Sequence, residues 1–510
     1  MKNLLFLFLL VISFDSIFGQ TSKPKNDSPA RPKQSGDVKK NDRPIRPIEI
    51  QNLVAEAYYT QPEFAADALM RLAKSKKVTD KQWKKELVEA AFKFAADAQQ
   101  PVRRKSANLG GYPVDTDAGY LSHAFGQNLD KLSLQSRAVK MMLDLDKQRA
   151  RELLDEITVK LSPSPLSCDD ALVYDVSEFY DTLRLAAEKT FSPAQIEQGE
   201  RTRLVLPHIE AISSHAQIVP ALKVIVALKP SLSESLILVS AFTQSLKKIN
   251  GDDRSFSYEL MRGGMMREIY QLTQALEQQA ISSESLLKVY RSYLQKNLNN
   301  ARCADSAIND ERALSQVLNA ANLYFFKNGT LTADNVKPDE ISGRAKIHEY
   351  WQSPQAKRLQ TLVKELRFGS KTEFLTDEND EGKQLTEAEK QTSEWREQLN
   401  QFLTELESWN EKDERSEIDY FHQRQVLYLA LVEIVPDGTA RNSVVRSWVA
   451  SLSDGSIEKH NRIEWRLYAD YLLKLTNKSK VEERAKMLEI ITDSKSSSLV
   501  LYAKLAQQQM

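Results

Sequence analysis

The two cysteines of this 510-residue sequence, Cys168 and Cys303, are the residues most able to do chemistry together. Two cysteines in a secreted protein favour one disulfide. This bridge would close a long loop and stabilise the fold by about 4–5 kcal/mol on the chain-entropy argument. Two alternatives stay open, a pair of unpaired buried thiols and a catalytic cysteine. Two thiols alone do not make a zinc site, which takes four ligands.

The six histidines form no metal-binding motif. His208 and His215 stand seven residues apart and could share one helical face. Metal sites on helices use closer spacing together with carboxylates, as in His-Glu-x-x-His, which does not occur here. We therefore expect packing or surface roles for the pair, and no metal site is predicted.

Two acidic stretches have the opening spacing of a calcium-binding EF-hand loop. They are Asp115, Asp117 and Gly119 in the first, and Asp377, Asn379, Glu381 and Gly382 in the second. The first lacks the remaining ligands, and the second has Ala388 at the position that needs a bidentate glutamate. Both stretches are therefore interpreted as surface loops.

No catalytic or cofactor-binding motif is present. The sequence has no phosphate-cradling glycine loop, no Gly-x-Ser-x-Gly elbow and no zinc-ribbon spacing. Carboxylates are so frequent that no pair can be singled out as acid and base. No catalytic residue and no cofactor is predicted, although helical glycosidases and lyases often lack short motifs.

The stretch Tyr59 to Ala98 indicates the elements that would position any site. Phe64, Leu69 and Leu72 recur at three- and four-residue steps with alanines between them, which is typical of a helix with one buried face. Capping boxes at Thr60 and Thr79 predict where two helices begin. The small alanines would let the two helices pack closely.

The same start signals recur along the chain, with Ser192, Ser231 and Thr386 each three residues before Gln or Glu. Glycine is scarce, at 16 residues, and no run of alternating β-formers occurs. These patterns predict an all-α fold, an array of antiparallel helical hairpins. Solenoid-like stacking, as in TPR or HEAT proteins, and an irregular helical assembly both remain open.

The N-terminus predicts export from the cytoplasm. Residues 1–19 have the charge and short apolar core of a signal peptide, cut near Gly19, with an uncleaved anchor as the alternative. Residues 20–47 form a proline- and lysine-rich linker whose composition is typical of disorder. With eight basic and four acidic residues in 20–49, the rest of the mature chain is slightly acidic, which argues against a nucleic-acid partner.

The remaining chain is divided into a main helical domain, 48–367, an acidic linker, 368–384, and a C-terminal helical region, 385–510. The most apolar part, 207–246, is interrupted by prolines and is too short to span a membrane. Five of the six tryptophans lie after residue 350. They are interpreted as core anchors, with binding of glycans or peptides by exposed rings as the alternative.

The runs PEFAADALMRLAKS and CDDALVYDVSEFYDTL, within residues 50–310, resemble secreted all-helical bacterial proteins with no assigned activity. This resemblance implies a helical fold and an envelope location, and it implies no reaction. We therefore expect a secreted or periplasmic helical interaction or scaffold protein, whose partner is a protein or an envelope polymer. The alternative is an enzyme that acts on cell-wall or extracellular polymer in a helical cleft.

Overall fold

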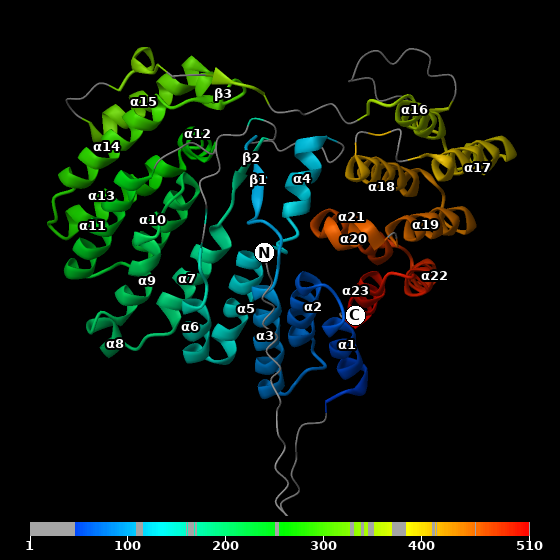
Figure 1. Ribbon diagram of the computed structural model, residues 1–510, viewed down its shortest axis with the longest axis horizontal. Coiled ribbons are helices and arrows are strands. Elements are labelled where there is room, and N and C mark those ends of the chain that lie inside the picture. The colour runs from blue at the N-terminus through cyan, green and yellow to red at the C-terminus, as the bar shows by residue number, and fades with distance from the viewer. Residues whose placement is uncertain are drawn as a thin grey trace, which may run out of the picture. The chain divides into compact units, whose positions relative to one another are not determined.

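The computed structural model covers most of the chain from Arg46 onward, and Figure 1 labels its helices and strands. The described residues are 46–108, 116–159, 161, 168, 171–249, 254–326, 331–337, 341–344, 351–369, 384–410, 414, 416–453 and 455–508. Within them the chain forms 23 α-helices and only two pairs of very short strands. The predicted all-α class is therefore confirmed. The predicted signal peptide and nearly all of the predicted linker lie outside the described residues.

The helices in the first part of the chain pack side by side in two series, in which most contacts skip from one helix to the next but one or further. They are α1 (Ile48–Tyr58), α2 (Pro62–Lys74), α3 (Lys81–Ala96), α4 (Asp117–Phe125), α5 (Lys131–Leu145), α6 (Lys147–Asp155), α7 (Ser177–Lys189), α8 (Pro193–Glu197), α9 (Glu200–Glu210), α10 (Ile218–Ala227), α11 (Leu232–Lys248), α12 (Ser255–Met261), α13 (Gly264–Gln278), α14 (Glu284–Leu298) and α15 (Glu311–Phe325). One series of contacts runs from α2 through α3, α5, α7 and α10 to α13, and a second from α7 through α9 and α11 to α14 (Figure 1). A regular solenoid repeat stays a prediction.

The later helices return to the start of the chain. They are α16 (Pro354–Phe368), α17 (Ser393–Ser408), α18 (Glu417–Ile434), α19 (Thr439–Leu452), α20 (Gly455–His460), α21 (Arg462–Lys478), α22 (Val481–Thr492) and α23 (Ser497–Gln508). Helix α21 contacts α4, and α23 contacts α1 and α2. The predicted linker 368–384 lies outside the described residues except at its ends, so the division into 48–367 and 385–510 stays a prediction.

Two short ladders and four 3-10 turns complete the described elements. β1 (Arg104–Ser106) pairs antiparallel with β2 (Leu172–Tyr174), and β3 (Arg302–Cys303) pairs parallel with β4 (Ile341–Ser342). The 3-10 turns are η1 (His215–Gln217), η2 (Ala307–Asn309), η3 (Ala333–Asn335) and η4 (Glu389–Gln391). No helix in the described residues is both long and apolar enough to cross a bilayer.

The start signals are confirmed at some helices and wrong at others. The capping boxes at Ser192 and Ser231 form as predicted, before α8 and α11. The box at Thr60 does not form, because its hydroxyl donates back to the carbonyl of Ala57 at the end of α1. Helix α3 is capped by Asp80, whose carboxylate accepts the Gln82 amide, so Thr79 does not cap it either.

Helix α2 is buried along most of its length. Its alanines pack with Phe64, Leu69 and Leu72 in the core, and each of these three side chains is at most 1% exposed. The apolar stripe predicted for this helix is therefore confirmed. Two acidic residues of the same helix, Glu63 and Asp67, are also buried, which the apolar pattern does not predict.

Glu63 joins α2 to the C-terminal helices. It is fully buried, and both of its carboxylate oxygens accept a hydrogen bond from Nη1 of Arg462, the first residue of α21, at 2.8 Å. Its Oε1 also accepts the backbone amide of Gln99 at 2.8 Å. A buried carboxylate requires such partners because desolvation alone would strongly destabilise its charge.

Asp67 lies one turn further along α2 and pairs with two arginines. Its carboxylate accepts bonds from Arg71 at 2.7 Å and from Arg137 of α5 at 2.6 Å. Burial opposes its ionisation, but the charges of these arginines and of Arg466 hold the pKa of the Asp67 carboxyl well below its usual range. Buried ion pairs therefore connect α2 with both the next helices and α21.

Glu464 of α21 is a buried carboxyl group whose pKa is raised, in contrast to that of Asp67. Burial raises its pKa to about 7. Between roughly pH 4.5 and 7 this carboxyl is protonated in the folded state but ionised in the unfolded state. The group therefore makes the protein less stable as pH rises through that window. At pH 8 the penalty is on the order of 3 kcal/mol.

Glu464→Gln is expected to remove this pH dependence. The variant should be more stable than the wild type above pH 7 and should differ little from it near pH 4.5, because glutamine mimics the protonated carboxyl. Urea unfolding followed by circular dichroism between pH 4.5 and 8 measures both curves. Parallel curves for the two proteins would show that the carboxyl is ionised in the folded state.

Candidate functional site

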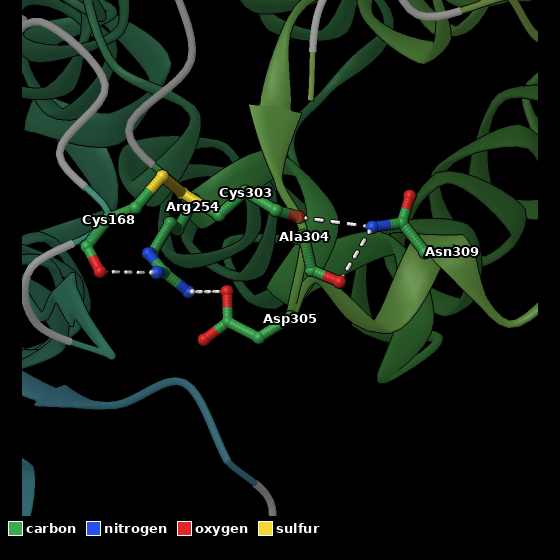
Figure 2. Close-up of a disulfide and its surroundings, with 6 residues drawn as sticks. All are labelled: Cys168, Arg254, Cys303, Ala304, Asp305 and Asn309. Atoms are coloured by element: carbon green, nitrogen blue, oxygen red, sulfur yellow. Dashed lines mark hydrogen bonds and ion pairs between the residues drawn. A yellow bond between two sulfur atoms is a disulfide. The ribbon is translucent and has the colours of Figure 1, made fainter. Parts of the chain in front are cut away.

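The predicted disulfide between Cys168 and Cys303 is present in the structure, with a sequence separation of 135 and Cα atoms 5.6 Å apart. It joins a residue preceding β2 to β3 (Figure 2). Both sulfur atoms are therefore committed to the bridge rather than held as thiols. The site is a covalent crosslink between two segments that are distant in the sequence.

Side chains around the bridge hold both segments in place. The buried Arg254 donates from Nη2 to the carbonyl oxygen of Cys168 at 3.4 Å, and its Nη1 pairs with Asp305 at 3.1 Å (Figure 2). Nδ2 of Asn309 donates to the carbonyl oxygens of Cys303 and Ala304. These contacts fix backbone positions, which is a structural role.

The histidine pair does not form a site. His208 lies in the last turn of α9 and packs edge-to-face on Phe179, and burial lowers its pKa. His215 lies in η1, where its Nδ1 is 2.6 Å from the hydroxyl of Tyr293. Both rings have packing partners, as predicted.

No cluster of three or more potential metal ligands occurs in the described residues. Asp117 and Gly119 of the first acidic stretch lie in α4, so the surface loop predicted there is wrong for these two residues. Asp115 and residues 377–382 lie outside the described residues.

Four of the five later tryptophans are core residues, as predicted, and Trp351 is half-buried against the core. Trp395, Trp409, Trp448 and Trp465 are each at most 5% exposed. Their indole nitrogens donate inward, for example from Trp448 to Gln425 at 2.7 Å. These rings therefore stabilise the packing of the C-terminal helices.

Four carboxyl groups have a pKa raised by burial: Asp130, Asp155, Glu259 and Glu464. None of them lines the surface groove between α19 and α22 or the one between α11 and α14. Asp130 has a local role, because its carboxylate caps α5 by accepting the amide of Ser133.

A groove between α19 and α22 is the strongest candidate for a binding site. Its volume is about 580 Å³, which is in the range of ligand pockets. Helix α19 and its C-cap contribute Asn442, Arg446, Val449, Ala450 and Ser453, and α22 and its C-terminal turn contribute Lys486, Glu489, Ile490, Asp493, Ser494 and Lys495. These positions recur at three- and four-residue steps, so each helix lines the groove with one face.

The groove carries charges of both signs without internal partners. In the part of the chain that the structure describes, no ion pair or side-chain hydrogen bond involves its five charged side chains: Arg446, Lys486, Glu489, Asp493 and Lys495. The neighbouring Arg441, outside the groove, pairs with both Asp437 and Glu483. The charges in the groove are thus available to a ligand.

Apolar and hydroxyl groups complete the lining. Val449 and Ile490 form apolar contact area, and the hydroxyls of Ser453 and Ser494 bond across the two helices at 2.7 Å. The side-chain oxygen of Asn442 is buried without a hydrogen-bond partner in the described residues. The arrangement combines apolar area with fixed polar groups, as binding sites commonly do.

The amino-acid sequence alone does not indicate this groove. On each helix its charged residues have the spacing of an ordinary solvated face, and only the packing of α19 on α22 brings the two faces together. No protein-family model matches the chain, and neither a curated protein nor a solved structure matches it.

Proposed function

We propose that the chain is an extracytoplasmic helical interaction protein that binds a segment of a partner protein in the groove between α19 and α22. The observation that carries this proposal is the set of five charged side chains, of both signs, that have no partner in the described residues. A partner segment with apolar residues between acidic and basic ones would complement both the charges and the apolar area.

The extracytoplasmic location is supported by the disulfide. Such bridges persist in oxidising compartments and are rare in the cytosol. The signal-like composition of residues 1–19 agrees with this location. The contacts between successive helices support an array that presents grooves on its surface. An enzyme acting on polymer stays a prediction.

Peptide selection tests the proposed groove. A display library of random peptides, each about ten residues long, is selected on the immobilised full-length chain, and dissociation constants are measured by fluorescence anisotropy. Lys486→Glu and Arg446→Glu are each expected to weaken the selected peptides about five- to tenfold, because an attraction becomes a repulsion. Ala450→Trp, on an exposed position of the lining, should obstruct binding by its bulk.

Lys364→Glu on α16 is the matched control, since it makes the same charge change on an exposed helical residue outside this groove. It should leave binding of these peptides within about twofold of the wild type. Selected peptides whose affinity is unchanged by all three groove variants would contradict the proposal. Unchanged circular-dichroism spectra of the variants check that each is folded.

A further inference from the structure

A second groove lies between α11 and α14, and its charge differs from that of the first. Its volume is about 470 Å³. Along α14 its lining runs from Ser285 to Lys296 at three- and four-residue steps, which is about 16 Å of helix. Lys247, in the last turn of α11, faces this stripe from the other wall.

The lining of this groove is basic. Lys247, Lys288 and Lys296 contribute three ammonium groups, and no carboxylate is among the lining residues that the structure describes. Lys296 donates to the carbonyl oxygen of Ile249 at 3.2 Å, which holds the end of α11 against α14. Neither Lys247 nor Lys288 has an ion pair within the described residues, in contrast to Lys85, which pairs with Asp146.

The other lining groups narrow the class of ligand. The hydroxyls of Ser285 and Ser292 lie on the same face as the lysines, and Leu246 and Val289 add apolar area. The lining contains no arginine, the side chain whose planar fork favours bidentate phosphate recognition. A groove with ammonium groups beside apolar area is complementary to a peptide that has both carboxylate and apolar side chains.

The spacing fits an extended peptide. Lys288 and Lys296 are eight residues apart, about 12 Å along the helix axis. Alternate residues of an extended strand are about 6.6 Å apart on one face, so acidic residues on one face of a short peptide could reach both lysines. Because the peptide would lie lengthwise between two walls, the apolar residues on its opposite face would point toward α11, where Leu246 lines the groove.

We propose that the groove between α11 and α14 binds an acidic segment of a partner polypeptide in which carboxylates alternate with apolar residues. This goes beyond the proposed function, because it assigns the chain a second binding surface with a ligand of different charge. The two surfaces are tested independently, since each groove has its own variants.

The test uses the full-length chain and a fluorescein-labelled peptide of alternating glutamate and leucine, about eight residues long. Lys288→Glu and Lys247→Glu are each expected to weaken binding about tenfold, and raising the salt from 50 to about 300 mM should weaken it further. Lys364→Glu, on an exposed position of α16 that lines neither groove, is the matched control and should leave this affinity within about twofold of the wild type.

Two further probes decide the ligand class. A peptide of alternating glutamate and serine should bind more weakly than the leucine peptide, because it lacks the apolar side chains. Inorganic polyphosphate should compete poorly. The proposal is overturned if Lys247→Glu and Lys288→Glu leave the leucine peptide's affinity unchanged, if the serine peptide binds equally well, or if polyphosphate binds more tightly than the peptide.

Discussion

Arg462→Met is expected to lower the free energy of unfolding by about 3–5 kcal/mol, because it leaves a carboxylate buried without its charged partner. Glu63 is fully buried, and the guanidinium of Arg462 contacts both of its oxygens at 2.8 Å. The remaining hydrogen bond, from the backbone amide of Gln99, does not neutralise the charge. Urea unfolding at neutral pH, followed by circular dichroism, measures the loss.

The position of this pair in the chain makes the effect large. Its two residues are 399 positions apart, and the contact joins α2 to α21. Nearby, Phe64 packs against Trp465 with ring centroids 5.2 Å apart, so the same two helices also share apolar area. Breaking the pair would therefore strain a contact between the first and last parts of the described chain.

A double variant separates two contributions to the lost stability: the loss of the ion pair itself and the cost of leaving one buried charge without a partner. Glu63→Gln with Arg462→Met should be less destabilised than the sum of the two single changes, because neither partner is then left charged and buried. Lys77→Met is the matched control, since Lys77 forms an exposed pair with Glu49 and should contribute little. Equal, small effects of Arg462→Met and Lys77→Met would contradict the interpretation.

The local pattern was sufficient to predict the helices, because helical periodicity depends on near neighbours. The apolar stripe of α2 and the caps at Ser192 and Ser231 follow from residues within one or two turns. The box predicted at Thr60 is wrong for a local and a long-range reason: the Thr60 hydroxyl bonds back to Ala57 of α1, and the carboxylate of Glu63 is bound by Arg462 instead of capping the helix. Local sequence cannot indicate such a partner.

Of the candidate sites, one could be predicted from the sequence and the others could not. The pairing of Cys168 with Cys303 could be predicted because only one pairing is available to two cysteines. The two grooves could not be predicted, because residues such as Arg446 and Lys288 have the spacing of ordinary solvated helix faces. Whether they line a groove depends on which helix packs opposite. Helix-to-helix contacts, which amphipathic patterns leave open, decide where a surface becomes a groove.

Removing the disulfide, by Cys168→Ala with Cys303→Ala, is expected to lower the free energy of unfolding by about 5 kcal/mol on the chain-entropy argument. The bridge closes a loop with a sequence separation of 135 residues, so the unfolded chain gains considerable freedom when it is cut. The double replacement avoids leaving a reactive thiol. Urea midpoints of the wild type and the variant measure the difference.

Reductant provides the control for this experiment. The reduced wild type should unfold at nearly the same urea concentration as the double variant, whereas the variant should be insensitive to reductant because it has no bridge. Arg254 and Asn309 hold the two segments by other contacts, so the folded state should persist after the bridge is lost. A different outcome would contradict this prediction: thiol titration shows complete reduction, yet the urea midpoint of the wild type does not move. The crosslink would then not stabilise the fold, because structure that remains in the unfolded chain would offset the entropy lost on closing the loop.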